Sequence, residues 1–317
     1  MSLIRSIKRV ASFIKFSTDL KRLKILMKSN PEDISILVPY MREKLRRGDE
    51  LPQSLMTRYV RLVIESDSEL EINNLAIAQE FLKQKYNIEI NLSEPTWEFW
   101  SKKFDLDWMN NLTAENLGTL KFYSCEIGNT KGLLTFSVSK LKVLIIHGNS
   151  IPRILGVSES ITSNLEKLSL QGPYKTKNLE WMRGLQLPKA KQINIQLAWI
   201  DDLSILGSIQ APNLVGLDLT GHHIENLNEL THLNFPNLQD INLSLGHLKN
   251  LDITSPLRLP KIKEINLSNN LIESIKGLPK SIYRKLFLYN NPIRYSDLTD
   301  EQKDEYPDIN LSGKPPW

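Results

Sequence analysis

Residues 262–272 read IKEINLSNNLI, and this stretch decides the fold. Its residues follow the spacing L-x-x-L-x-L-x-x-N-x-L, in which the alternation at the fourth and sixth positions predicts one short strand with an apolar side. Because one copy can bury that side only against another copy, the copies must stack. Eight copies occur, in steps of 24, 24, 25, 24, 24, 24 and 21 residues, and they begin at Leu117, Leu141, Leu165, Ala190, Leu214, Leu238, Ile262 and Tyr283.

This pattern resembles the leucine-rich-repeat family over about residues 112–295. The resemblance implies an α/β fold, namely a leucine-rich-repeat solenoid of about eight repeats whose strands form a curved parallel sheet. In the family, an Asn at the ninth position hydrogen-bonds backbone groups of the turn. The middle copies carry Pro173, Ala198, His222 and Gly246 at that position. We expect these copies to lack the bond pattern of the family and to have looser turns.

The first 110 residues lack the repeat and show helical spacing instead. We expect an all-α N-terminal domain over 1–110, repeats over 111–295 and a C-terminal cap over 296–317, because an open end of a stack exposes apolar side chains and strand edges. The helices expected in the first domain cover 3–28, 31–47, 52–65 and 70–86, and an apolar and aromatic segment over 97–108 leads into the repeats.

The segment 51–100 resembles an F-box in Leu51-Pro52, in Leu55 and in the closing residues Glu94-Pro95-Thr96-Trp97. It departs from that family in its second helix, where Ala76, Ala78 and Gln79 replace a Val-Cys-basic-aromatic cluster. The resemblance implies that Leu51, Pro52 and Leu55 hold a Skp-type adaptor, while the repeats hold a substrate of a Skp/cullin ubiquitin ligase. The alternative is a helical N-terminal cap that binds no adaptor.

The positive charge of the chain is local. Residues 1–50 hold 12 Lys and Arg against 6 Asp and Glu, whereas the remaining residues hold 28 against 30. Residues 1–18 contain four basic residues and no acidic one, which is the composition of a mitochondrial presequence. A mitochondrial assembly or structural factor is therefore one alternative to an intracellular protein of the cytoplasm or nucleus, and a leucine-rich-repeat effector of a pathogen is another.

Motifs that carry chemistry are missing from the sequence. It contains no G-x-x-x-x-G-K-[ST], no H-E-x-x-H and a single cysteine, Cys125, which stands at a core position of the first repeat. We therefore expect no enzyme, no catalytic residue, no cofactor, no bound metal and no small-molecule substrate. No apolar run is long enough to span a membrane, and one cysteine cannot form an internal disulfide, which favours a reducing compartment.

Strand residues that alternate with the core leucines face away from the core. We expect them to bind a protein partner on the concave face, as a non-catalytic protein–protein interaction module. The first copies offer basic and apolar side chains, later copies offer acidic ones, and the last copy is basic and aromatic. No aromatic and basic pattern specifies nucleic-acid bases. The candidate partner-binding residues are Lys121, Tyr123, Ile145, His147, Lys167, Asp218, Asp240, Glu264, Lys285, Phe287 and Tyr289.

Overall fold

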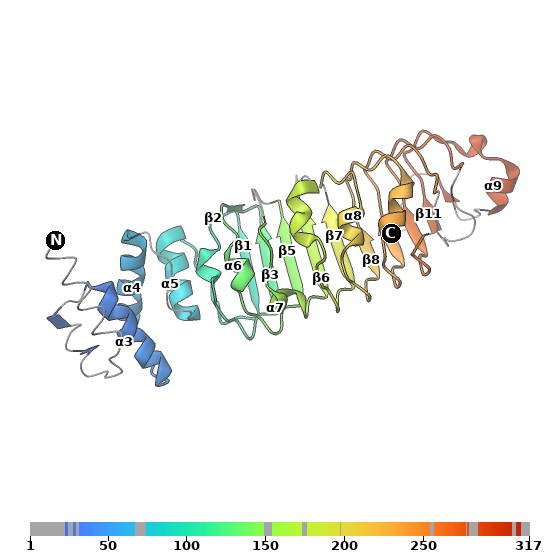
Figure 1. Cartoon of the computed structure of the whole chain (residues 1–317). Coiled ribbons are helices and arrows are strands. Elements are labelled where there is room, and N and C mark those ends of the chain that lie inside the picture. The colour runs from blue at the N-terminus through green and yellow to red at the C-terminus, as the bar shows by residue number, and fades with distance from the viewer. Residues whose placement is uncertain are drawn as a thin grey trace, which may run out of the picture.

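The computed structural model describes residues 23–24, 28–29, 32–66, 74–148, 154–172, 176–196, 198–253, 257–276, 278, 285–305 and 309–311. Most of the predicted helix over 3–28 and all of the presequence-like residues 1–18 lie outside these ranges. Along one long axis, the described elements run from helices at the N-terminal end through a broad sheet to a short C-terminal helix (Figure 1).

Three of the predicted N-terminal helices are confirmed in the described residues. The first begins where the Asp33 carboxylate accepts a hydrogen bond from the backbone N–H of Ser35, and the third begins where Asn74 caps Ala76 in the same way. The third ends at Asn87, whose φ of 53° lies in the left-handed region. The helices are α3 (Ile34–Arg46), α4 (Gln53–Glu65) and α5 (Leu75–Tyr86).

A ten-stranded parallel sheet dominates the α/β fold, and it forms the broad middle of the molecule in Figure 1. Its strands lie side by side in chain order, β1-β3-β5-β6-β7-β8-β9-β10-β11-β12, so each pairs with the next in that order. Eight of the ten fall within the predicted repeats. The strands are β1 (Thr96–Trp100), β3 (Thr119–Tyr123), β5 (Val143–His147), β6 (Lys167–Gln171), β7 (Gln192–Gln196), β8 (Gly216–Asp218), β9 (Asp240–Asn242), β10 (Glu264–Asn266), β11 (Lys285–Phe287) and β12 (Ile309–Asn310).

The sheet begins earlier than the repeat pattern predicts. Strand β1 lies in the segment expected to be part of the helical domain, and it pairs with β3 so that Trp97 stands opposite Leu120 and Phe99 opposite Phe122. Trp97 and Phe99 are buried, so tryptophan and phenylalanine take the core positions that leucines hold in later copies. The closing Trp97 of the F-box-like segment is thus a core residue of the sheet.

The C-terminal residues add the other edge of the sheet. Strand β12 pairs in parallel with β11, placing Ile309 opposite Leu286. Between the two strands lie the 3-10 turn η4 (Tyr295–Asp297) and helix α9 (Asp300–Glu305). The segment predicted as a cap therefore covers the last repeat strand with a strand of its own.

One hydrophobic core joins the helices to the repeats. One side of each strand points into it, and the return segments cover it from the other side with short helical turns such as α6, whose Leu133 is buried. Burying one such leucine stabilises the fold by about 1.5–3 kcal/mol. The return segments contain η1 (Asp107–Met109), α6 (Gly132–Thr135), α7 (Glu159–Thr162), η2 (Thr176–Met182), α8 (Ser204–Gly207) and η3 (Leu227–His232), and a two-stranded sheet pairs β2 (Lys103–Phe104) with β4 (Glu126–Ile127).

The ninth-position asparagines bond the turns as the family resemblance implies. The Asn270 side-chain amide donates to the backbone oxygens of Leu243, Leu267 and Ser268, and its oxygen accepts from the N–H of Leu248. Each such bond contributes about 0.5–1.5 kcal/mol net, and a buried N–H left without a partner costs about 1–3 kcal/mol.

His222 corrects, for its own copy, the expectation that the middle copies lack these bonds, whereas Pro173 lies outside the described residues. Its Nδ1 accepts from the N–H of Ile224 at 3.0 Å, so the ring proton sits on Nε2, which donates to the Leu243 oxygen at 2.9 Å. The ring fills the space beside Gly246, where a Cβ atom would lie 2.3 Å from Nε2. Burial lowers the pKa of His222 to about 4, so the imidazole is neutral at pH 7.

Candidate partner-binding face

The face of the sheet opposite the core, here called the open face, carries the predicted partner-binding residues. They stand at the strand positions that alternate with buried residues, and the strands accordingly alternate between buried and half-buried or exposed side chains. Ten of the eleven are half-buried or exposed. These ten are Lys121, Tyr123, Ile145, His147, Lys167, Asp218, Asp240, Glu264, Lys285 and Tyr289.

Phe287 is the exception, because only 6% of its surface is exposed. Its strand, β11, is covered by β12, and Asn310 stands directly opposite Phe287. The edge strand was not expected from the sequence, and without it Phe287 would lie on the last strand of the sheet. The ring is thus a wall of the face and not a projecting anchor.

Three rings form a row at one end of the open face. Trp100 stacks on Tyr123 with ring centroids 4.1 Å apart, and Tyr123 meets His147 edge to face at 5.7 Å. Trp100 is 57% exposed. With Val143 and Ile145 beside them, these rings make the aromatic end of the face. The sequence predicted Tyr123 and His147 but missed Trp100, whose 23-residue offset from Tyr123 is the signal that could have found it.

Two lysines lie at or beside the aromatic end, and one of them is paired with a carboxylate. Lys121 Nζ lies 2.6 Å from a carboxylate oxygen of Glu98 on the neighbouring strand, and this bond lowers the pKa of Glu98 and raises that of Lys121. His147 Nε2 lies 2.7 Å from Ser169 Oγ, and burial, followed by the charge of Lys167, lowers the His147 pKa. The charge of Lys121 is thus balanced, while Lys167 adds a positive charge beside the rings.

The other end of the open face is acidic. Asp218, Asp240 and Glu264 come from the adjacent strands β8, β9 and β10, and Asp240 stands directly opposite Glu264. These three carboxylates make the acidic end of the face. They line a hollow of about 170 Å³, which Phe287 also lines. Burial, followed by repulsion from Glu264, raises the pKa of Asp240.

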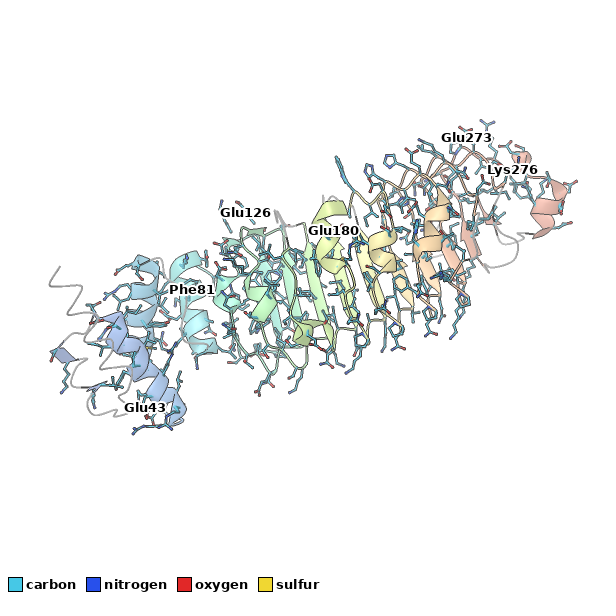
Figure 2. The ribbon with its side chains drawn as sticks, in the orientation of Figure 1. Glu43, Phe81, Glu126, Glu180, Glu273 and Lys276 are labelled. Atoms are coloured by element: carbon cyan, nitrogen blue, oxygen red, sulfur yellow. The ribbon has the colours of Figure 1, made fainter. Side chains whose placement is uncertain are left out.

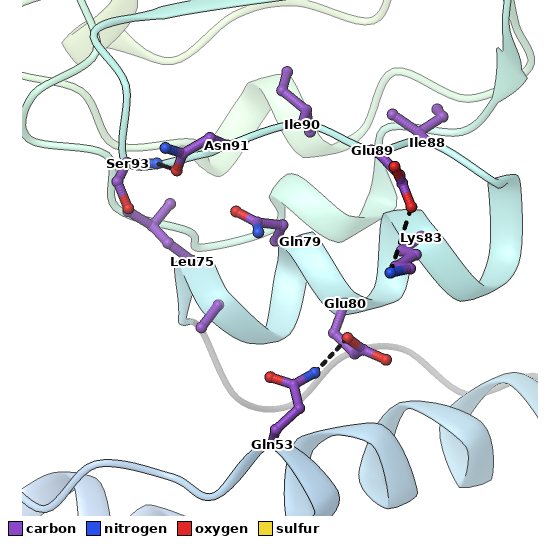
Figure 3. A pocket seen from close by; sticks show the side chains of 11 residues that line it. Gln53, Leu75, Gln79, Glu80, Lys83, Ile88, Glu89, Ile90, Asn91 and Ser93 are labelled. Atoms are coloured by element: carbon purple, nitrogen blue, oxygen red, sulfur yellow. Dashed lines mark hydrogen bonds and ion pairs between the residues drawn. The ribbon is translucent and has the colours of Figure 1, made fainter.

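A hollow of about 650 Å³ lies beside α5 (Figure 3). Its lining is mostly polar. Gln53 donates to Glu80 at 2.6 Å across it, and Lys83 pairs with Glu89 at 3.4 Å (Figure 3). The described residues that line this hollow are of mixed kinds and form no row of aromatic rings or of carboxylates such as the open face carries.

The predicted adaptor-binding residues lie at the start of α4. Leu55 is buried, Leu51 is half-buried and Pro52 is exposed at the helix N-cap. A second hollow, of about 420 Å³, is lined in part by Leu51. Leu55 therefore stabilises the helical region and offers no surface to an adaptor. Of the three residues predicted to bind an adaptor, only Leu51 and Pro52 are accessible.

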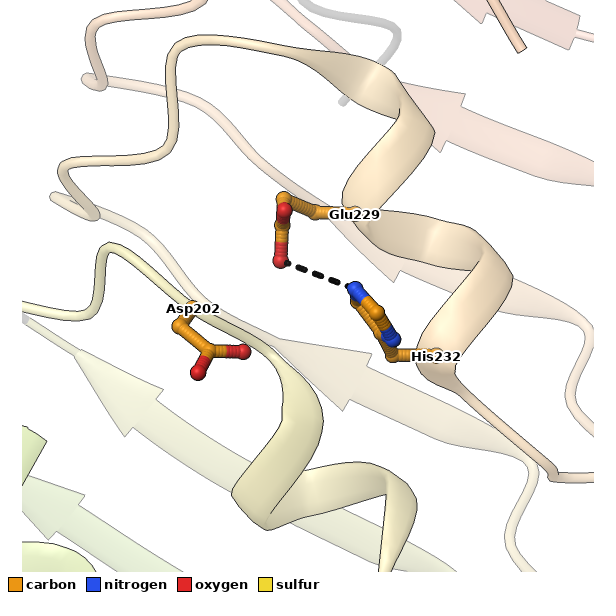
Figure 4. Close-up of side chains that lie close together, drawn as sticks. All are labelled: Asp202, Glu229 and His232. Carbon is orange, nitrogen blue, oxygen red and sulfur yellow. Dashed lines mark ion pairs between the residues drawn. The ribbon is translucent and has the colours of Figure 1, made fainter. Parts of the chain in front are cut away.

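One side-chain group has metal-ligating chemistry that the sequence did not indicate. Asp202, Glu229 and His232 place their donor atoms within 4.8 Å of one another (Figure 4). Both carboxylates already have partners at the start of α8: Asp202 accepts from the N–H of Ser204 at 2.6 Å, and Glu229 accepts from that of Leu203 at 3.1 Å. These residues could hold a divalent cation, but bonds within the chain already account for their positions, since His232 Nε2 in turn lies 3.7 Å from a carboxylate oxygen of Glu229.

Cys125 is buried, and its thiol donates to the backbone oxygens of Phe99 and Tyr123 at 3.4 Å each. Burial raises the pKa of the thiol. The cysteine thus takes the bonding role of the ninth position, as a protonated group in the core. Among the described residues, no helix combines the length and the apolar composition that crossing a membrane requires.

No protein-family model matches the sequence, and no curated protein matches it. Solved structures do match. One is the crystal structure of a TLR13–ssRNA13 complex, with a TM-score of 0.51 and 19% sequence identity, over 84% of this chain and 38% of that chain. TLR13 is a leucine-rich-repeat protein. This chain thus spans well under half the length of the chain it resembles, and the likeness, with the parallel sheet, shows a leucine-rich-repeat-like fold.

Proposed function

We propose that this chain is a non-catalytic protein-interaction module, a leucine-rich-repeat solenoid that binds a protein partner on its open face. The observation that carries the proposal is the row formed by Trp100, Tyr123 and His147. A tryptophan that is 57% exposed yet stacked at 4.1 Å is held rigid without being buried. Rigid aromatic side chains of this kind dominate the energy of protein interfaces, because they bury a large area at little cost in conformational entropy.

A protein partner fits the charges of the face better than a nucleic acid does. Binding nucleic acid draws most of its free energy from Lys and Arg contacts to phosphates. On this face Lys121 is paired with Glu98 and Lys285 with Glu264. The positive charge of Lys167 is outnumbered by the negative charges of Asp218 and Asp240. The single-stranded RNA belongs to the TLR13 complex, and the charges on the open face of this chain favour a polypeptide.

The pair His147 and Ser169 does not favour catalysis. A hydroxyl 2.7 Å from an imidazole is the arrangement of a serine nucleophile and its base. Ser169, however, is only 2% exposed, so a substrate carbonyl has no approach to its Oγ. The bond supports a structural role, in which Ser169 orients the His147 ring within the row.

The narrower function, a substrate receptor of a Skp/cullin ligase, stays a prediction. Its sharpest test is co-purification with a Skp-type adaptor. Substituting Leu51→Ala and Pro52→Ala should abolish that association, and an unchanged association would exclude these residues from it.

Site-specific photo-cross-linking tests the proposed function. A benzophenone amino acid placed at Tyr123 should cross-link to a protein in cells, whereas the same group at Leu134, which is exposed on α6, should not. Leu134 is the control because it is a large apolar residue that is exposed on the return segment, across the core from the sheet. Equal yields at the two positions, or products that ribonuclease removes, would contradict the proposal.

A further inference from the structure

The acidic end of the open face carries more carboxylates than ion-paired cations. Glu264 pairs with Lys285 at 2.8 Å, but among the described residues no cation pairs with Asp218 or Asp240. Asp218 accepts from neutral donors alone, namely Thr220 and the Gln196 side chain at 2.6 Å. Three carboxylates against one ion-paired ammonium leave this end with an excess of negative charge, which Lys263 offsets only through space, since its Nζ bonds the Gln239 side chain.

The like charges at this end repel one another. Asp240 and Glu264 stand opposite each other on neighbouring strands, a placement that destabilises a sheet. The pKa of Asp240 is raised by burial and then by this repulsion, and the charges of Lys263 and Lys285 offset the rise only in part. A cation brought by a partner would relieve the repulsion, so the free energy that the fold loses here is regained on binding.

The hollow between these carboxylates fits one side chain. Its volume of about 170 Å³ is well below the roughly 300–1,000 Å³ of pockets that enclose a small-molecule ligand. Gly216 has no side chain to fill it, and the ring of Phe287 forms one apolar wall. An apolar wall beside carboxylates suits the long aliphatic stem and charged head of lysine or arginine.

The aromatic and acidic ends lie a defined distance apart. Five steps in the strand order separate β3, which carries Tyr123, from β9, which carries Asp240. At about 4.8 Å per step this separation is roughly 24 Å, which an extended chain spans with about seven residues. Between the ends, Gln192 and Asn194 on β7 offer amides that can bond the backbone of such a chain.

We propose that the open face binds an extended segment of a protein partner with two anchors, an aromatic or large apolar side chain on the aromatic end and a lysine or arginine on the acidic end, about seven residues apart. This inference rests on the proposed function and adds the chemistry of the partner. Charge complementarity decides the occupant, because phosphates placed over Asp218 and Asp240 would be repelled.

Phage display of random 16-residue peptides against the full chain tests this inference. Enriched peptides should carry a Trp, Phe or Leu and a Lys or Arg separated by about five to nine residues. Their dissociation constants, measured by fluorescence polarisation, should rise at least tenfold with Trp100→Ala and with Asp240→Asn. Glu273→Gln is the matched control, since it removes one exposed carboxylate at the outer margin of the repeats (Figure 2) and should leave binding unchanged.

The outcomes separate the inference from the proposed function. Enriched peptides that lose affinity with Trp100→Ala, yet are acidic or carry a single anchor, would overturn the two-anchor inference and leave the function standing. No enrichment, or peptides indifferent to both face variants, would overturn both. Tighter binding of single-stranded oligo-uridine than of any selected peptide would assign the face to nucleic acid and overturn both as well.

Discussion

Replacing His222 with Asn should remove a specific dependence of stability on pH. The buried His222 ring bonds Ile224 and Leu243 only as the neutral tautomer, since protonation would turn its Nδ1 acceptor into a donor facing an N–H. Asparagine supplies one acceptor and one donor to the same kind of turn, as Asn270 does in a later copy. The substitution therefore keeps the bonding chemistry and removes the titrating group.

The size of the effect follows from the pKa of His222. An exposed imidazole titrates at 6.5, whereas burial, with smaller contributions from His247 and His223, lowers the folded-state pKa to about 4. Between these values the unfolded chain binds a proton that the folded chain does not, so the stability from this residue is complete above pH 6.5 and is lost as the pH falls toward 4. A difference of about 2.5 pKa units corresponds to roughly 3 kcal/mol.

Urea unfolding of both proteins at intervals from pH 7 to pH 4 measures this difference. At pH 7 the variant should be less stable by about 1–3 kcal/mol, because the smaller Asn leaves a cavity beside Gly246. Toward pH 4 this difference in stability should shrink by about 3 kcal/mol, so that it closes or reverses, while the carboxylates titrate alike in both proteins. Parallel stability curves would refute a buried neutral imidazole at position 222.

Three further predictions concern stability at pH 7 and are checked by chemical denaturation. Asn270→Ala should lower the free energy of unfolding by about 2–4 kcal/mol, because it removes four hydrogen bonds and leaves a buried N–H without a partner. A loss below about 1 kcal/mol would contradict a stabilising role of these Asn270 bonds. Gly207→Ala should cost at least about 2 kcal/mol, since its Cβ would lie 2.0 Å from the His232 backbone oxygen, and a neutral effect would refute this close approach. Phe287→Ala should cost about 3–5 kcal/mol and Tyr289→Ala about 1 kcal/mol or less, because only Phe287 is buried; equal costs would contradict that difference.

The repeat strands were predictable because two independent periodicities agree in them. The step of 24 residues sets which copies stack, and the alternation within L-x-L sets which side of each strand is apolar. Together they placed Leu120 and Leu144 in the core, and Lys121 and Ile145 on the open face, where the structure has them. No tertiary contact competes with this pattern, because each copy touches mainly its neighbours.

The structure departs from prediction where a residue changes type or where a distant segment contributes. Strand β1 was not predicted because its segment does not match the repeat pattern. Trp97 and Phe99 take the place of the leucines, and Glu94 stands where the first apolar residue of a copy would be. Phe287 was expected to project because nothing local indicates that residues 309–310 add a strand beside it. His222 was expected to break the turn pattern because the sequence does not show that its ring fills the space beside Gly246 in the next copy.

The most direct test of the open face as a binding site is a calorimetric titration of a protein cross-linked through position 123. The identified partner is titrated into the wild-type chain, into a Trp100→Ala/Asp240→Asn variant and into Glu273→Gln, after denaturation has shown that all three are folded. We predict a dissociation constant at least tenfold higher for the face variant and an unchanged value for Glu273→Gln. Equal affinity of the partner for all three proteins would contradict the claim that the open face is the binding site.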